Sequence, residues 1–86
     1  MTALNNLTGA DGTAMSEVSA IQWGEEEARL TIASYHGDIA DGYGELDAWR
    51  TLLSRRNHAA CYIDVPRAWQ AYRDTLLAEF PQLEGQ

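Results

Sequence analysis

Hydrophobic residues recur at helical spacing in the middle of the chain. Leu46, Trp49 and Leu53 follow the i, i+3, i+7 pattern that places side chains on one face of a helix. Two carboxylates lie at the start of this stripe and a pair of arginines follows it, in the order that the helix dipole favours. The pattern therefore predicts an amphipathic helix over residues 45–56, with Asn57 as a left-handed stop.

A second stripe runs along the C-terminal part of the chain. Its members repeat at i, i+3, i+7 and i+11: Trp69, Tyr72, Leu76 and Phe80. Pro66 suits the first turn of this helix because that turn has spare N–H groups, and Asp64 is placed to cap it. Pro81 cannot continue a helix. A second amphipathic helix is therefore predicted over residues 66–80.

The N-terminal half favours strands rather than helices. Within residues 27–35, every second residue from Ala28 to Ile32 is apolar, which is the period-two pattern of a half-buried strand. Residues 17–23 form a less regular strand pattern. The short connection between the two runs begins with Gly24 and continues with two glutamates, so we expect a β-hairpin here.

These elements combine into an α+β domain. Residues 59–64 form a short apolar run that is either a third, buried strand or a linker between the helices. The predicted fold has an N-terminal β-hairpin, with or without this third strand, and two amphipathic helices packed on one face of the small sheet. The single domain would span residues 17–81, between a flexible leader at residues 1–16 and a frayed tail at residues 82–86.

Negative charge is concentrated in the first half of the sequence. The 86-residue chain has a formal net charge of −7. Residues 1–47 contain nine of its 13 acidic residues and only one arginine, whereas residues 48–86 contain five arginines. An acidic field of this kind repels nucleic acid and anionic lipid and attracts basic surfaces. We therefore expect a basic protein partner, with no direct nucleic-acid contact and no membrane contact.

The sequence carries no signal for membrane insertion or secretion. It lacks a run of about 18 apolar residues, and it begins without the basic and apolar regions of a secretion signal. Cys61 stands alone between apolar neighbours, which favours a buried, unreactive thiol and excludes an intramolecular disulfide. The expected location is the cytoplasm.

The acidic region before the first predicted helix invites a test for calcium binding. With Asp38 as the first EF-hand ligand, Ala40 and Gly42 occupy the third and fifth ligand positions, so the pattern fails. His36 and His58 lack the spacing of a zinc site. The sequence also lacks a phosphate-binding glycine loop and a nucleophile elbow. We expect no enzyme activity, no cofactor and no metal.

The favoured hypothesis is a non-enzymatic protein-binding module. Three Trp and four Tyr are more than one small core readily buries, and aromatic residues are typical interface anchors. The predicted partner-binding residues combine aromatic and acidic side chains: Tyr35, Asp38, Asp41, Tyr43, Glu45 and Asp47, with Glu25 and Glu26 at the hairpin tip. This surface would dock on a basic surface of a larger protein, for example one that handles nucleic acid.

In size, charge and lack of catalytic motifs, the chain resembles as a class the small acidic inhibitors that phages and mobile elements direct against host nucleases, such as anti-CRISPR and anti-restriction proteins. The resemblance implies an inhibitor of host defence.

Two other functions remain open. One is a structural or homo-oligomeric adaptor, such as a homodimer, whose aromatic surface is buried by self-association. The other is a nucleic-acid binder that uses the arginines around the two helices: Arg50, Arg55, Arg56, Arg67 and Arg73.

Overall fold

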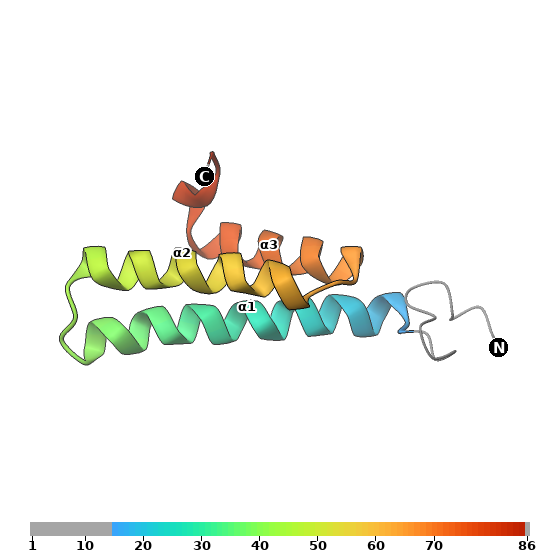
Figure 1. Cartoon of the computed structure of the whole chain (residues 1–86). Helices are drawn as coiled ribbons and strands as arrows, with labels where there is room; N and C mark the ends of the chain where they lie inside the picture. The colour runs from blue at the N-terminus through green and yellow to red at the C-terminus, as the bar shows by residue number, and fades with distance from the viewer. Residues whose placement is uncertain (1–14, 86) are drawn as a thin grey trace.

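The computed structural model describes residues 15–85, which fold into three α-helices and a short 3₁₀ helix. The three helices are α1 (Glu17–Ala40), α2 (Glu45–Tyr62) and α3 (Pro66–Glu79). Each helix runs antiparallel to the one before it, so that α1 and α3 point the same way (Figure 1). The 3₁₀ helix η2 (Pro81–Leu83) follows α3. The described residues contain no strand, so the α+β prediction is wrong and the fold is an all-helical three-helix arrangement.

The predicted β-hairpin is instead the 24-residue helix α1. Ser16 caps this helix, because its side chain accepts a hydrogen bond from the Ser19 N–H at 3.0 Å. Gly24 and the glutamates after it lie inside the helix and form no turn. The strand-like alternation also fails to match burial, since Ala28 is buried and Leu30 is exposed. Glutamate and alanine, both good helix formers, are the most frequent residues of α1.

One face of α1 carries small residues that bring α3 close. Four buried residues at helical spacing form this face: Ala20, Gly24, Ala28 and Thr31. A β-carbon at Gly24 would overlap the carbonyl oxygen of Ala68 and would lie 2.9 Å from the β-carbon of Ala71. Helices α1 and α3 therefore meet almost backbone to backbone at Gly24.

Two buried hydroxyl groups join α1 to α3. Thr31 Oγ1 donates to the Glu27 carbonyl oxygen at 3.2 Å and lies 3.0 Å from the Tyr72 hydroxyl oxygen. Either hydroxyl can donate the second bond, because each carries one proton and can also accept. Burial raises the pKa of Tyr72, so its phenol stays protonated at neutral pH, although the Thr31 hydrogen bond acts in the opposite direction.

Helix α2 is confirmed as a helix, but its end and its buried face differ from the prediction. It continues past Asn57 to Tyr62, so Asn57 is not a stop and the arginine pair does not occupy the last turn. Leu46 is 60% exposed, while Trp49 and Leu53 are half-buried. The buried face of α2 consists of Ala48, Leu52 and Ala59.

Residues 59–64 are neither a strand nor, as a whole, a linker. The first four of them complete α2, and only Ile63 and Asp64 separate that helix from Val65, the N-cap of α3. Cys61 lies in the last turn of α2 and is exposed rather than buried, because Ala59 and Ile63 take the core-facing positions there.

Helix α3 lies where the sequence predicts it. Pro66 opens the helix, which ends at Glu79, two residues before Pro81. The predicted capping by Asp64 is wrong, because Val65 is the N-cap and no side chain of the described residues caps this end. The predicted stripe faces the core, with Trp69 half-buried and three residues buried: Tyr72, Leu76 and Phe80.

An aromatic cluster joins all three helices beyond the end of α3. The Phe80 ring packs edge-to-face against Tyr35 of α1 and Trp49 of α2, with ring centroids 5.1 Å and 5.7 Å apart. Tyr35 and Trp49 also meet edge-to-face at 6.2 Å. We call Tyr35, Trp49 and Phe80 the aromatic cluster.

The structure describes the predicted tail almost completely but only the end of the predicted leader. Residues 1–14 of the predicted leader lie outside the described residues. Leu83 of η2, in the predicted tail, is buried against the core. Across residues 15–85, none of the helices is both long enough and apolar enough to cross a membrane.

Candidate functional site

A tight turn joins α1 to α2 and fixes the acidic region. Gly42 has a φ of +97°, which glycine adopts without strain. Its N–H donates to the Ile39 carbonyl oxygen, and the Tyr43 N–H donates to the Asp38 carbonyl oxygen, each at 3.1 Å. This pair of bonds is the Schellman arrangement, with Gly42 in the position that needs a positive φ. The side chains of the turn therefore project from a backbone held in place by its own hydrogen bonds.

Acidic and apolar side chains surround this turn. Glu45 and Asp47 lie in the first turn of α2, where the helix dipole stabilises carboxylates, as predicted. The apolar side chains beside them are well exposed, with 39% of Ile39 and 60% of Tyr43 accessible. We call this set the turn patch: Asp38, Ile39, Asp41, Tyr43, Glu45, Leu46 and Asp47.

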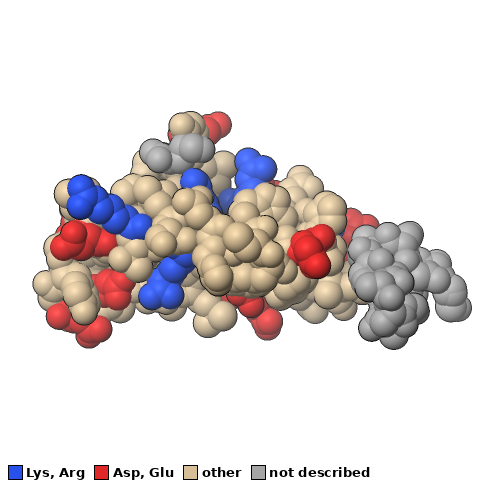
Figure 2. Space-filling model, viewed as in Figure 1, with Lys and Arg blue, Asp and Glu red and all other residues tan. Residues whose placement is uncertain are grey.

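The four carboxylates of the turn patch form no ion pair with residues 15–85. The ion pairs of the described chain lie elsewhere: Glu25–Arg29, Glu79–His36 and Glu17–Arg67. Figure 2 shows acidic side chains gathered at the end of the molecule where Figure 1 places the α1–α2 turn. The negative charge of the turn patch is therefore available to an outside partner.

The structure brings five of the eight predicted binding residues into the turn patch and places three elsewhere. Tyr35 belongs to the aromatic cluster, where its ring packs against Trp49 and Phe80. Glu25 and Glu26 lie in the middle of α1. At 1.5 Å per helical residue, Glu26 is about 18 Å along the axis from Asp38, so these glutamates are not part of the patch.

Sequence reasoning missed two members of the patch, Ile39 and Leu46. Leu46 fitted the helical stripe of α2 and was therefore expected in the core. Ile39 lay in a region interpreted as a turn. Only the solvent exposure of these residues in the structure shows that both side chains are accessible beside the carboxylates. The sequence did contain one signal for an apolar contact within the acidic surface, namely an isoleucine between Asp38 and Asp41.

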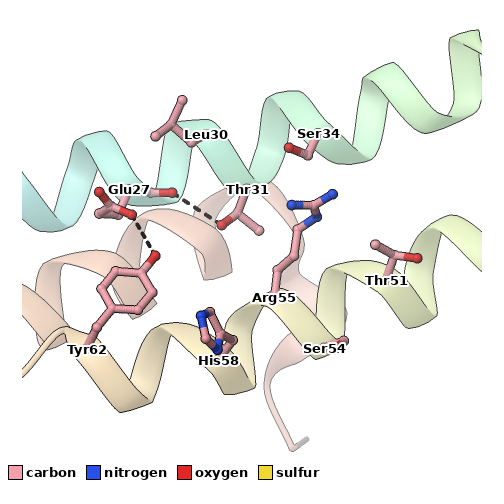
Figure 3. Close-up of a pocket in the computed structure, with 9 residues that line it drawn as sticks. All are labelled: Glu27, Leu30, Thr31, Ser34, Thr51, Ser54, Arg55, His58 and Tyr62. Atoms are coloured by element: carbon pink, nitrogen blue, oxygen red, sulfur yellow. Dashed lines mark hydrogen bonds between the residues drawn. The ribbon is translucent and has the colours of Figure 1, made fainter.

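A groove of about 410 Å³ lies between α1 and α2. Figure 3 labels its nine lining side chains and shows Arg55, His58 and Tyr62 pointing from α2 toward α1, with the α3 ribbon behind them. A neighbouring pocket of about 250 Å³ shares Thr51 and Arg55 with this groove and reaches the turn patch. The two hollows form one continuous surface, which we call the α1–α2 trough.

The end of the trough away from the turn is crossed by a hydrogen bond. The Tyr62 hydroxyl donates to the Glu27 carboxylate at 2.7 Å, and the His58 ring packs edge-to-face against Tyr62 at 5.5 Å (Figure 3). The hydrogen bond to Glu27, then burial and the negative charge of Glu27, raise the pKa of Tyr62 from 10.0 to about 12.

Removing the Glu27 carboxylate should lower the pKa of Tyr62 toward 10. Because the pKa is raised in the folded state, the Tyr62–Glu27 bond stabilises the fold fully below pH 10 and ceases to do so as the pH rises from 10 to about 12. NMR titration of the tyrosine rings in Glu27→Ala, with Glu26→Ala as the matched control, measures the shift. A wild-type Tyr62 that titrates at 10 would contradict the hydrogen bond.

The arginines of the nucleic-acid alternative are distributed over several surfaces. Arg67 pairs with a glutamate of α1 at 3.2 Å, and Arg55 lines the α1–α2 trough. Arg56 and Arg73 line a separate groove of about 430 Å³ together with two carboxylates. Within residues 15–85 each of these arginines shares its surroundings with negative charge, which weakens attraction for a phosphate backbone.

The described residues contain no group of three His, Cys, Asp or Glu side chains placed to hold a metal ion. His36 lies 3.5 Å from a Glu79 carboxylate oxygen and packs against Tyr35, whereas His58 packs against Tyr62, so the two histidines belong to different surroundings. The expectation of a protein without enzyme activity or cofactor stays a prediction.

Comparisons of the chain with protein-family models, with curated proteins and with solved structures found no match. Its function therefore has to be argued from the turn patch and the α1–α2 trough.

Proposed function

We propose that this protein is a non-enzymatic binding module whose turn patch docks on a basic surface of a larger protein. The observation that carries the proposal is the presence of exposed Tyr43 and Leu46 among carboxylates that have no ion pair within residues 15–85. Carboxylates alone are typical of a solvated surface. Large apolar side chains surrounded by carboxylates are typical of a contact surface with a hydrophobic centre and a polar rim.

The two kinds of side chain would serve different parts of binding. Burial of Ile39, Tyr43 and Leu46 against the partner would supply contact energy, because water leaves their exposed apolar surface. The carboxylates would steer the encounter with a basic surface and disfavour acidic partners. The Schellman turn would lower the entropy cost of binding, since its backbone is already ordered.

The partner we propose is a protein that handles nucleic acid, and the proposed effect is inhibition. Such proteins carry basic surfaces for phosphate groups, and these surfaces complement the charge of the turn patch. This function agrees with the acidic phage inhibitors of host defence that the chain resembles as a class. We place it in the cytoplasm, where a single exposed thiol such as Cys61 stays reduced.

Reversing the charge of the turn patch should abolish partner capture. In the triple variant Asp38→Arg, Asp41→Arg and Asp47→Arg, like charges meet across the interface, which costs several kcal/mol. We expect a loss of affinity of at least about a hundredfold. Tagged chains would capture proteins from a lysate of the native host, mass spectrometry would identify the captured protein, and calorimetry would measure its affinity.

The control is a second triple variant, Asp64→Arg, Asp74→Arg and Glu84→Arg. All three residues are exposed and lie outside the turn patch, and the variant changes the net charge by the same amount. It should keep most of the wild-type affinity, and circular dichroism would verify the helical content of both variants. Equal capture by the two variants would refute the turn patch as the contact. Heparin should compete with the turn patch if the captured surface normally binds nucleic acid.

A further inference from the structure

The α1–α2 trough continues from the turn patch along a face of the bundle that no element within residues 15–85 covers. It follows α2 from Asp47 to Tyr62, a length of about 22 Å at 1.5 Å per residue. Its rim is apolar in two places, since Leu30 is 62% and Tyr62 43% exposed. In Figure 3 the α3 ribbon lies behind the trough, so the opening faces away from the third helix.

A helix suits this trough better than an extended segment. A β-strand segment binds by pairing its backbone groups with a sheet edge, and the described chain contains no strand. A helix satisfies its own backbone hydrogen bonds and can place an apolar stripe between two neighbouring helices. The occupant is therefore a helix about four turns long.

The charges along the trough define the side chains of that helix. Asp38 and Asp47 line its end at the turn, and Arg55 lines its middle. Within residues 15–85 Arg55 forms neither an ion pair nor a side-chain hydrogen bond. Asp47 and Arg55 are eight residues apart, about 12 Å along α2. A complementary helix has Lys or Arg at one end and a carboxylate about two turns away.

A second copy of this chain fits the trough poorly. Each copy carries a formal charge of −7. A symmetric dimer would pair this surface with itself, and the lining holds three carboxylates (Glu27, Asp38 and Asp47) against one arginine, so two net-negative surfaces would meet. The charge favours a partner with basic residues over self-association.

We infer that the α1–α2 trough binds an amphipathic helix of the partner, with its basic end over Asp38 and Asp47 and a carboxylate against Arg55. The inference rests on the proposed function, because the partner that docks on the turn patch supplies the helix. The binding surface then extends from the α1–α2 turn to Tyr62, and the partner's helix becomes a fourth helix of the bundle.

The test uses two trough variants, each with a matched control on the same helix. Arg55→Glu reverses the central charge, and Arg50→Glu makes the same change at an exposed position outside the trough lining. Ser34→Trp fills the trough, and Ala33→Trp adds the same side chain at an exposed position outside the lining. The probes are the protein captured by the wild-type chain and synthetic 20-residue peptides tiled across its sequence.

We expect both trough variants to lose at least about tenfold in affinity for the captured protein, and both controls to bind within about twofold of wild type. One tiled peptide should bind, become helical by circular dichroism and shift the NMR signals of Thr51 and His58. Wild-type affinity in both trough variants, or the absence of a helical peptide, would overturn the inference about the trough. The proposed function would still stand if the charge-reversed turn-patch variant fails to capture the partner. Capture of nothing by the wild-type chain would overturn both.

Discussion

Gly24→Ala should destabilise the protein by about 3 kcal/mol, the upper end of the usual range for overpacked sites. The added methyl group would overlap the Ala68 carbonyl oxygen and crowd the Ala71 β-carbon and the Tyr72 N–H, each 2.9 Å away. Two of these three contacts are backbone atoms, so a change of side-chain conformation cannot relieve them. Helices α1 and α3 would have to separate, which would also loosen the Thr31–Tyr72 hydrogen bond. Urea unfolding followed by circular dichroism measures the loss.

Gly37→Ala is the matched control for this substitution. Gly37 also lies inside α1, but a β-carbon there would have no neighbouring atom of residues 15–85 within 4 Å. Since alanine favours a helix over glycine by about 1 kcal/mol, Gly37→Ala should stabilise the protein by up to that amount. The same preference acts at Gly24, so opposite signs for the two variants isolate the packing effect. Equal stability of both variants would contradict the close approach of α1 and α3.

Phe80→Ala should cost about 3–5 kcal/mol, the range for removing a buried aromatic side chain. Phe80 is 6% exposed and packs against both other members of the aromatic cluster. Its loss leaves a cavity at the junction of the three helices and removes two edge-to-face ring contacts. Urea unfolding should show the loss of stability, and tryptophan fluorescence should change because Trp49 loses a ring neighbour.

Leu46→Ala serves as the control for Phe80→Ala. Leu46 is a large apolar residue, but it is 60% exposed, so its truncation should change the free energy of unfolding by no more than about 0.5 kcal/mol. The same variant should weaken partner capture, because Leu46 belongs to the turn patch. A large loss of stability in Leu46→Ala would mean that this residue packs in the core as the sequence pattern predicts.

The sequence predicts α3 well because its signals agree with one another. The stripe of large apolar residues faces the core, and prolines lie just inside its start and just after its end. The buried face of α2 was predicted only in part: Trp49 and Leu53 pack against the core, but Leu46 is exposed. Ala48 and Ala59, which are buried, are too small to stand out in a pattern of large residues. In α3 the large apolar residues of the stripe are buried, whereas in α2 small residues take part of the buried face.

Helix α1 was misinterpreted for a related physical reason. Its core-facing residues are alanine, glycine and threonine, which carry little hydrophobic signal, whereas Leu30 is exposed. The visible alternation of apolar residues therefore came partly from residues outside the core. Gly24, which usually marks a turn or weakens a helix, lies here because α3 passes too close for any side chain.

The candidate site was only partly accessible to sequence reasoning. The acidic residues are near one another in the sequence, so their grouping at the α1–α2 turn follows from short-range connectivity. The α1–α2 trough joins residues such as Glu27 and Tyr62, which lie 35 positions apart and meet only once both helices are placed. The absence of Tyr35 from the turn patch likewise depends on packing against Phe80, far away in the sequence.

Helix α1 serves three surfaces at once, and this restricts how its length can vary. It presents Gly24 to α3, Glu27 and Ser34 to the trough, and Asp38 to the turn patch. Each residue turns the helix by about 100°, so one inserted residue between Gly24 and Glu27 would rotate the later side chains away from their present directions. Inserting or deleting a single residue between Gly24 and Glu27 would therefore uncouple the packing of the bundle from the surface offered to a partner.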